Sequence, residues 1–402
     1  MRNKALVMIA VTLVLATSAW ASSESVLYNF GVSGDGLYPQ SELVADKAGN
    51  LYGTTEYGGT ANLGTVFELT PSGTETLLYS FTGGATDGAY PIHAPLVFDK
   101  AGNLYGETSQ GGPVNAGTVF ELKLSGGTWT ETVLHIFNAY PKDGYNPQSG
   151  LSFDAAGNMY GTTVQGGKNN LGTVFQMKQS KGKWTEKLIH NFASGNGGYY
   201  PYGGIVVGAN GYFYGTTYYG GTTFNAGTVY RLFSARGSWV EQVVYIFTGG
   251  AGGTNPYAGM TMDTAGNFYG TTYVGGNSNY GTVYKLTLGK NKKYTQKVLY
   301  SFKGYLSNDG EYPEFAAVIL DAKGNIFGAT YQGGSSSNEG TVYELKLTKG
   351  KYKESVLHAF VDTSGSDGYY PQAGVILVKG KLYGTSEYGG IHGYGTVFEV
   401  TP

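Results

Sequence analysis

The sequence contains no cysteine in its 402 residues. Disulfides, thiolate metal sites and cysteine nucleophiles are therefore excluded, and the fold depends on the burial of side chains alone. Charged residues make up only 13% of the chain, and the formal net charge at pH 7 is −2. With so little charge of either sign, we expect no nucleic-acid partner.

Long apolar runs are almost absent. The one run, from Ala5 to Ala16, is too short to span a bilayer comfortably, so we expect no membrane span. It follows two basic residues and precedes the small-x-small sequence Ala19-Trp20-Ala21, a pattern typical of a secretory signal peptide. We therefore predict a cleaved signal peptide over residues 1–21 and a secreted or periplasmic mature protein over residues 22–402. No cysteine follows the run, which excludes a lipoprotein anchor.

Familiar catalytic and cofactor motifs are also missing. The sequence has no Walker-type loop, Rossmann fingerprint, G-x-S-x-G elbow or H-E-x-x-H motif, and no stretch has a helical hydrophobic period. We therefore predict neither a cofactor nor a metal. Glycine and tyrosine are instead abundant, with 67 and 36 residues. Because the glycines recur at fixed positions, they indicate turns rather than disorder.

These fixed positions belong to a repeat of about 54 residues. The sequence of Ala48–Leu69, AGNLYGTTEYGGTANLGTVFEL, recurs seven times with small changes. Its last signature, Gly-Thr-Val-Phe/Tyr, begins at Gly64, Gly117, Gly172, Gly227, Gly281, Gly340 and Gly395, which lie 53 to 59 residues apart. Each unit contains four short runs with strand character, separated by turn residues.

The connections between these runs predict how the strands are arranged. The first and third connections are tight hairpins, whereas the second and the one between units are longer. The mature chain opens on a lone fourth strand, Val26–Phe30, and closes on a lone set of the other three. We therefore predict a single all-β domain, a monomeric seven-bladed β-propeller of four-stranded blades, closed when the N-terminal strand pairs beside Gly395–Val400. An open β-solenoid is the alternative, but it does not need that first strand.

The repeat resembles the GloVer-type tandem repeat of bacterial exported "choice-of-anchor" proteins. The motifs D-x-A-G-N-x-Y-G-T-T, G-G and G-T-V-[FY] carry the resemblance, and they recur together along the whole mature chain. The resemblance implies an exported propeller and assigns no activity to particular residues. Members of that family can carry a C-terminal anchoring segment. We expect no anchor here, because the sequence ends at Pro402 within a repeat.

The long connections predict a ligand site on one face of the propeller, which we call the long-loop face. This face gathers many tyrosines, and the residue after each loop proline should line the mouth of the central channel. These residues are Gln40, Ile92, Gln148, Tyr202, Tyr257, Glu314 and Gln372. All except Ile92 are predicted to bind ligand. Blades two and six have one extra residue here, which we expect to present His93 and Glu314 differently.

Two classes of function fit this face. The first is a non-catalytic binding or surface-interaction module for a glycan or polysaccharide, using stacking on tyrosines and hydrogen bonds to amides. The second is a polysaccharide lyase or hydrolase at the channel mouth, with His93, Glu314, His392 and Glu42 as acid–base candidates. Identical Tyr and Asp residues are spread evenly around the ring, and this favours binding, because catalysis needs an asymmetric cluster.

Other repeated polar residues have structural interpretations. His135, His190 and His358 occupy a strand position held elsewhere by tyrosine, so we interpret them as packing variants. Five loops share an Asp-Gly-x-(Tyr/Asn)-Pro motif, with the acids Asp35, Asp87, Asp143, Asp309 and Asp367. One carboxylate per loop falls short of the six to eight oxygens that calcium takes. We therefore interpret these acids as turn-forming.

Basic residues gather in the hairpins of the opposite face, most strongly across blades three to six, whereas acidic residues gather on the long-loop face. The hairpin group includes Lys178, Lys181, Lys183, Lys290, Lys292, Lys293, Lys297, Lys349, Lys351 and Lys353. We predict that this basic face contacts an anionic cell-surface polymer. The alternative is that these lysines only keep exposed hairpins soluble.

Overall fold

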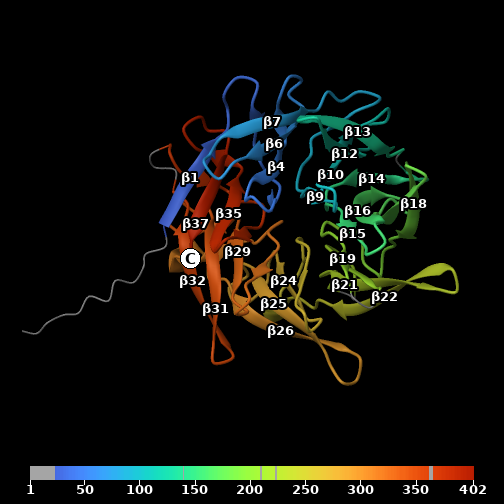
Figure 1. The fold of residues 1–402 in the computed structure, drawn as a ribbon. Helices are drawn as coiled ribbons and strands as arrows, with labels where there is room; N and C mark the ends of the chain where they lie inside the picture. Colours follow the sequence, from blue (N-terminus) through green and yellow to red (C-terminus); the bar gives the residue numbers. More distant parts are fainter. Residues whose placement is uncertain (1–22, 139, 209–210, 222–223, 362–364) are drawn as a thin grey trace, which may run out of the picture.

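The computed structural model describes residues 23–138, 140–208, 211–221, 224–361 and 365–402. Seven four-stranded antiparallel sheets surround a central axis (Figure 1), which confirms the predicted seven-bladed β-propeller. The predicted signal peptide lies outside the described residues. Two 3-10 turns, η1 (Gly250–Gly252) and η2 (Tyr305–Ser307), are the helical segments of the described part, and no helix there is long enough to cross a membrane.

Each blade uses four strands that follow one another from the axis to the rim (Figure 1). Blade one has β3 (Val44–Ala45), β4 (Leu51–Thr55), β6 (Thr65–Leu69) and β7 (Glu75–Ser80). Blade two has β9 (Val97–Phe98), β10 (Leu104–Thr108), β12 (Thr118–Ser125) and β13 (Thr128–Ile136). Blade three has β15 (Ser152–Phe153), β16 (Met159–Gly166), β17 (Thr173–Ser180) and β18 (Lys183–Asn191). Blade four has β19 (Val206–Val207), β20 (Phe213–Thr217), β21 (Thr228–Ala235) and β22 (Ser238–Ile246).

The remaining three blades repeat the pattern. Blade five has β23 (Thr261–Met262), β24 (Phe268–Thr272), β25 (Thr282–Leu288) and β26 (Tyr294–Ser301). Blade six has β28 (Ile319–Leu320), β29 (Ile326–Thr330), β31 (Thr341–Thr348) and β32 (Lys351–Ala359). Blade seven has β34 (Ile376–Val378), β35 (Lys381–Ser386) and β37 (Thr396–Thr401), and its outer strand is the N-terminal β1 (Ser23–Asn29).

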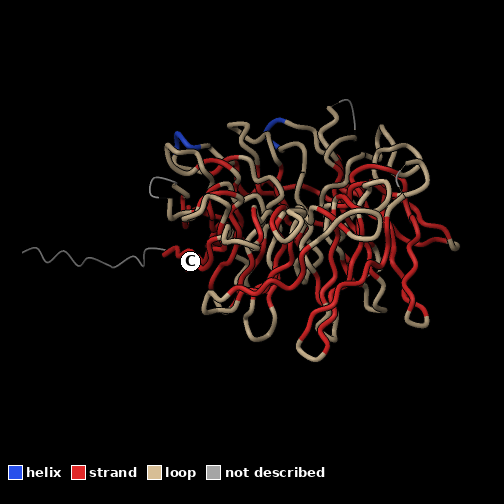
Figure 2. The backbone as a smooth tube through the Cα atoms, turned by 90° about the horizontal axis from the view of Figure 1, so that it is seen from above, coloured by secondary structure: helices blue, strands red, loops and turns tan. Residues whose placement is uncertain are grey.

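Short strands hold the loops of the long-loop face in place. In most blades, the loop that enters the blade pairs antiparallel with the loop between that blade's second and third strands. The pairs are β2 (Gly36–Leu37) with β5 (Tyr57–Gly58), β8 (Gly88–Ala89) with β11 (Gln110–Gly111), β14 (Gly144–Pro147) with β16, β27 (Gly310–Glu311) with β30 (Gln332–Gly333), and β33 (Gly368–Tyr369) with β36 (Tyr388–Gly389). Figure 2 shows these loops and both 3-10 turns along one edge of the disc and the long hairpins along the other.

The apolar core lies between blades rather than within them. One cluster combines Tyr52 and Phe81 of blade one with Leu104 and Phe120 of blade two. The second strand of each blade packs tightly in this core. In β4, an added Cβ at Gly53 would lie 2.6 Å from the ring of Phe67 in β6, so only glycine fits there. Burial therefore holds neighbouring blades to one another.

A proline contact links each loop to the preceding blade. An added Cβ on Gly64 would lie 2.5 Å from Cδ of Pro91, and the Tyr90 N–H donates to the Leu63 carbonyl at 2.8 Å. The residue before each proline has a φ of 53° to 62°, at Tyr38, Tyr90, Asn146, Tyr200, Asn255, Tyr312 and Tyr370. The same proline–glycine contact recurs in all seven blades. It explains why the Gly-Thr-Val motif and the loop proline repeat together.

The N-terminal strand closes the ring as predicted. β1 pairs antiparallel with β37, from Ser23 opposite Thr401 to Asn29 opposite Thr396. Phe30 follows β1, is fully buried, and packs edge-to-face on Phe67 of blade one at 5.1 Å between ring centroids. The first residues of the described chain therefore join its last strand to its first blade.

Candidate functional site

The seven loops meet at the channel mouth, where one side chain crosses the axis. His93, which has a φ of 56°, reaches from blade two toward glutamines on both sides. Its Nε2 lies 2.9 Å from Oε1 of Gln372, and its Nδ1 lies 3.4 Å from Oε1 of Gln148. The imidazole stacks on Phe315 of blade six with 3.6 Å between ring centroids. His93 of blade two therefore contacts blade three on one side and blades six and seven on the other.

One half of the mouth is aromatic. Tyr202 and Tyr257 stack with 4.4 Å between ring centroids, and Tyr257 also meets Phe315 edge-to-face at 4.3 Å. Tyr218 completes the group, 4.8 Å from Tyr257. All four rings remain partly exposed. Blades four to six thus present a continuous aromatic platform to the long-loop face.

The other half of the mouth is built from amides and carboxylates. The buried Gln40 amide donates to Oε2 of Glu56 at 2.7 Å and to Oε1 of Glu387 at 3.0 Å. The Gln372 amide donates to the other oxygen of Glu387. Blades seven and one therefore supply a hydrogen-bonding side, in contrast to the aromatic platform of blades four to six. This division of the mouth was not visible in the separate repeats.

Burial sets the charge state of the mouth. It lowers the pKa of His93 to about 4, so the ring is neutral at neutral pH. A neutral imidazole has one N–H, and the shorter contact assigns it to Nε2, donating to Gln372. Burial, with a contribution from Glu387, raises the pKa of Glu314 to about 7. The mouth therefore holds one acid that protonates near neutrality, Glu314, and a histidine that does not.

A cavity of about 180 Å³ lies on the axis between the mouth and the innermost strands. Glu42 lines it, at a position where the other blades have proline, alanine or glycine: Pro95, Gly150, Gly204, Gly259, Ala317 and Gly374. The Glu42 carboxyl has no hydrogen-bond partner among the described residues, and burial raises its pKa to about 7. Glu42 thus brings a carboxyl group into a lining that also includes Gln40, His93 and Ser149 among apolar side chains and glycines.

A second axial acid, Glu107, was missed by the sequence analysis. It replaces the first threonine of the Tyr-Gly-Thr-Thr motif, where Thr54 of blade one donates to the Pro91 carbonyl at 2.8 Å. Oε2 of Glu107 accepts the Gly150 N–H at 3.0 Å, while Oε1 is buried without a partner in the described structure. Burial raises the pKa of Glu107 to about 8. The signal in the sequence that could have identified Glu107 is the departure of blade two, Tyr-Gly-Glu-Thr, from the Tyr-Gly-Thr-Thr motif of most other blades.

The predicted site residues separate into two groups. The structure brings Gln40, Gln148, Tyr202, Tyr257 and Gln372 to the mouth. His93 also lies there, and it lines the axial cavity together with Glu42. Glu314 is close enough to raise the pKa of Tyr257. His392 lies apart, exposed and beside Gly31 at the end of the outer strand of blade seven. Ligand binding and catalysis at these residues stay predictions.

Several solved structures have a similar fold. A putative 6-phosphogluconolactonase from Bacteroides uniformis is 15% identical, with a TM-score of 0.52 over 78% of this chain and 83% of its own. The periplasmic gluconolactonase of Pseudomonas aeruginosa is 13% identical, with a TM-score of 0.48 over 79% and 84%. The GH93 α-L-arabinofuranosidase of Fusarium graminearum is 14% identical, with a TM-score of 0.44 over 80% and 91%. At these identities the likeness concerns the fold alone.

Sequence comparison gives a more specific result. No curated protein is significantly similar in sequence. The Gloeobacter/Verrucomicrobia repeat, however, matches residues 85–261 and 223–402, which together include most of the chain. The "choice-of-anchor" character predicted above stays a prediction. The repeated motifs, their 54-residue spacing and this match agree that the chain belongs to the Gloeobacter/Verrucomicrobia repeat family.

Proposed function

We propose that this propeller is an exported, non-catalytic binding module whose ligand is a glycan held at the channel mouth on the long-loop face. The observation that carries the proposal is the division of the mouth into an aromatic half and an amide–carboxylate half. A sugar ring has an apolar C–H face and a rim of hydroxyl groups. Each part has a matching surface here, and Gln40 of one half lines the same axial cavity as Tyr202 and Tyr257 of the other.

The aromatic half supports stacking. Tyr202, Tyr218 and Tyr257 hold one another in fixed orientations, with centroid separations of 4.4 to 5.7 Å. Rings fixed in this way lose little freedom when a ligand arrives. The amide–carboxylate half supports hydroxyl recognition, because Gln40, Glu387 and Gln372 form one connected network of donors and acceptors.

The state of His93 supports binding over catalysis. A general base or acid near neutral pH needs a pKa close to that pH, and burial lowers the pKa of His93 to about 4. Its nitrogens face amides rather than a carboxylate. The alternative, a polysaccharide lyase or hydrolase, is favoured by one observation: Glu42 and Glu314 both have pKa values raised to about 7, which suits acid–base chemistry.

A glycan array, run beside a product assay on any polysaccharide that binds, tests both functions. For a ligand found this way, the Tyr202→Ala/Tyr257→Ala variant should weaken affinity by roughly tenfold or more per ring lost. The matched control is Tyr305→Ala, which removes an exposed tyrosine of the same face in η2. Equal binding by the double variant places the ligand elsewhere. Release of shorter or unsaturated products establishes the enzyme instead.

A further inference from the structure

The outer strands of neighbouring blades meet at seven junctions, and each junction brings together three equivalent positions. The first lies near the end of an outer strand, the second in the loop that follows, and the third in the outer strand of the next blade. Three junctions are Tyr28/Asp35/Glu75, Tyr79/Asp87/Glu131 and Tyr300/Asp309/Glu354. Two are His135/Asp143/Glu186 and His358/Asp367/Glu24. Two lack the Asp: His190/Gly197/Glu241 and Tyr245/Gly252/Gln296.

The tyrosine junctions lack the imidazole nitrogen, although Oε1 of Glu75, Glu131 and Glu354 is buried without a hydrogen-bond partner there as well. Tyr300 Oη lies 2.6 Å from Oδ2 of Asp309 and 3.2 Å from Oε2 of Glu354. Burial and the Asp309 hydrogen bond raise the pKa of Tyr300 far above its ordinary value, so this oxygen keeps its proton and is no metal ligand at neutral pH. Burial raises the pKa of Glu354 to about 7, so a proton neutralises this carboxyl readily.

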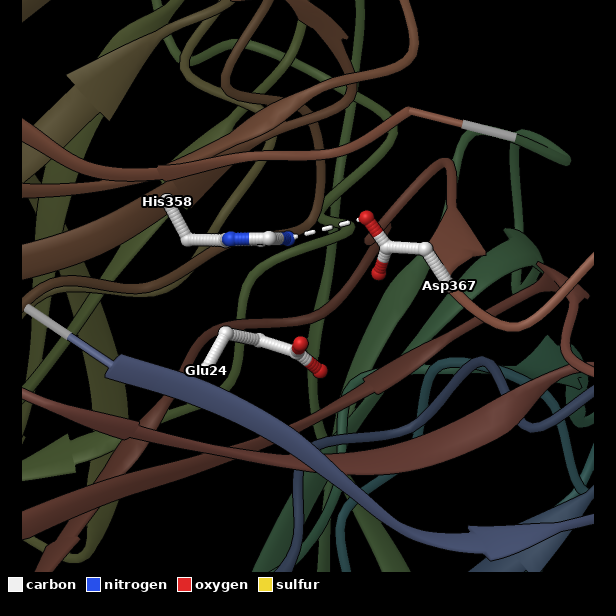
Figure 3. A group of neighbouring side chains, drawn as sticks. All are labelled: Glu24, His358 and Asp367. Atoms are coloured by element: carbon white, nitrogen blue, oxygen red, sulfur yellow. Dashed lines mark hydrogen bonds and ion pairs between the residues drawn. The ribbon is translucent and has the colours of Figure 1, made fainter. Parts of the chain in front are cut away.

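The histidine junctions differ in their donor set. His358 Nε2 lies 3.1 Å from Oδ2 of Asp367, and His135 Nε2 lies 3.1 Å from Oδ2 of Asp143. In each junction one nitrogen and one oxygen from each of two carboxylates lie within 4.8 Å of one another. Figure 3 shows His358 and Asp367 facing each other, with the Glu24 carboxyl directed toward the same space from β1. Side chains from three separate segments thus converge on one small volume.

The acids of these junctions are already oriented, and one oxygen of each glutamate is unused. Asp367 accepts the N–H groups of Gly368 at 2.8 Å and Val361 at 3.0 Å, which fixes its carboxylate. Oε1 of Glu24 and Oε1 of Glu186 are buried without a hydrogen-bond partner in the described structure.

We propose that His135/Asp143/Glu186 and His358/Asp367/Glu24 are two binding sites for a divalent transition metal, best suited to zinc. One imidazole and two carboxylates, with water in the fourth position, form a three-ligand set of the kind that zinc accepts. A tetrahedral ion with bonds of about 2.1 Å separates its ligand atoms by about 3.4 Å, whereas here the His and Asp atoms lie 3.1 Å apart and all three ligand atoms lie within 4.8 Å. Calcium prefers six to eight oxygens, so it suits these sites poorly.

A metal ion bound by Glu24, His358 and Asp367 would also stabilise the closure of the ring. Its ligands come from β1, from β32 of blade six and from the loop that enters blade seven. An ion there joins the N-terminal strand to two blades that it otherwise meets through hydrogen bonds and packing. Because the unfolded chain does not hold these groups together, metal binding stabilises the closed ring.

The repeat itself supplies substitutions that remove the ligand and preserve the fold. His135→Tyr and His358→Tyr convert each junction to the form seen at Tyr28, Tyr79 and Tyr300. Zinc binding to chelator-treated protein, followed by calorimetry and by metal analysis after gel filtration, should give two ions per chain for the wild type. Each single variant should retain one and the double variant none. Near-ultraviolet circular dichroism establishes that the variants are folded.

Two further variants separate these sites from adventitious binding. His190→Tyr removes a histidine whose junction lacks the Asp, and it should leave two ions bound. Tyr79→His places an imidazole beside Asp87 and Glu131, and it should add a third. Zinc should raise the melting temperature of the wild type and of His135→Tyr, but less in His358→Tyr. Binding should weaken as the pH falls, because protons compete with the metal for the ligands.

The proposal is overturned if the folded wild type binds no zinc at micromolar concentration. It is equally overturned if the double variant His135→Tyr/His358→Tyr binds as many ions as the wild type. Cobalt gives an independent check, because a tetrahedral site of this kind produces visible absorption bands that the double variant should lack.

Discussion

The rim and the axis of this propeller come from the same repeat, yet residue identity is largely constant among blades at the rim and changes from blade to blade at the axis. At the rim, six of the seven junctions place a glutamate in the outer strand, and five place an aspartate in the loop before it. At the axis, the position after the loop proline changes among glutamine, isoleucine, tyrosine and glutamate. Glu42 and Glu107 each occur once. The rim therefore repeats one arrangement with few substitutions, whereas the side chains at the axis differ from blade to blade.

The largest expected effect is at the rim, where closure depends on one strand. Deletion of residues 22–31 removes β1 and exposes the edge of β37, so we expect aggregation or a large fall in melting temperature. Phe30→Ala is the milder form and should cost about 3–5 kcal/mol of unfolding free energy. The control Val32→Ala alters a residue that is 53% exposed and should change stability by less than about 0.5 kcal/mol. A monodisperse deletion variant with unchanged melting temperature contradicts closure by β1.

An intermediate effect is expected at the axis, where Glu107→Thr restores the residue of five other blades. Removal of a buried carboxyl with an unpartnered oxygen should stabilise the fold at pH 8 by about 1–3 kcal/mol. The folded pKa is raised to about 8 from 4.5, so the folded state holds a proton that the unfolded state has lost. Wild-type stability should therefore fall as pH rises from about 4.5 to 8.

Glu107→Gln is the matched control, because it keeps the size of the side chain and removes the titration. Denaturant unfolding at pH 5 and pH 8 measures the effect. Both variants should lose the Glu107 part of the decrease with pH. If either variant retains the whole wild-type decrease, Glu107 is not the group responsible.

The smallest effect on stability is expected at the hairpins of the opposite face. Lys290, Lys292, Lys293 and Lys297 are exposed around the hairpin between β25 and β26. Their joint substitution by Glu should leave the melting temperature nearly unchanged. It should advance elution from an anionic polysaccharide column at low salt, and added salt should abolish the difference. The control Lys142→Glu/Lys168→Glu/Lys303→Glu changes the long-loop face instead. Equal elution of wild type and hairpin variant leaves only a role in solubility.

The sequence predicts the fold well because the information is local and repeated. Gly-Thr-Val and the loop proline mark each blade, and the unmatched Val26–Phe30 strand reveals how the ring closes. The channel-mouth positions follow from the order of strands and loops within each repeat. This order predicts that Tyr202 and Tyr257 lie on adjacent blades, and the two rings do stack on each other.

Contacts across the axis and between outer strands were not predictable in this way. His93 meets Gln372, which lies 279 residues away, only because an extra residue and a positive φ turn its loop inward. Glu24 meets Asp367 because the ring has closed. No single repeat contains both partners of either contact. Such contacts depend on blade curvature, which the hydrophobic pattern does not encode.

The residue before each loop proline has a consequence for the thermodynamics of recognition. A tyrosine or asparagine at positive φ is less stable by roughly 1–2 kcal/mol than in an ordinary conformation, and packing against the preceding blade compensates for this. Proline fixes the next φ as well. The loops that carry the mouth residues are therefore ordered before any ligand arrives. Binding should show a small loss of backbone entropy and an association rate limited by diffusion and orientation rather than by loop rearrangement.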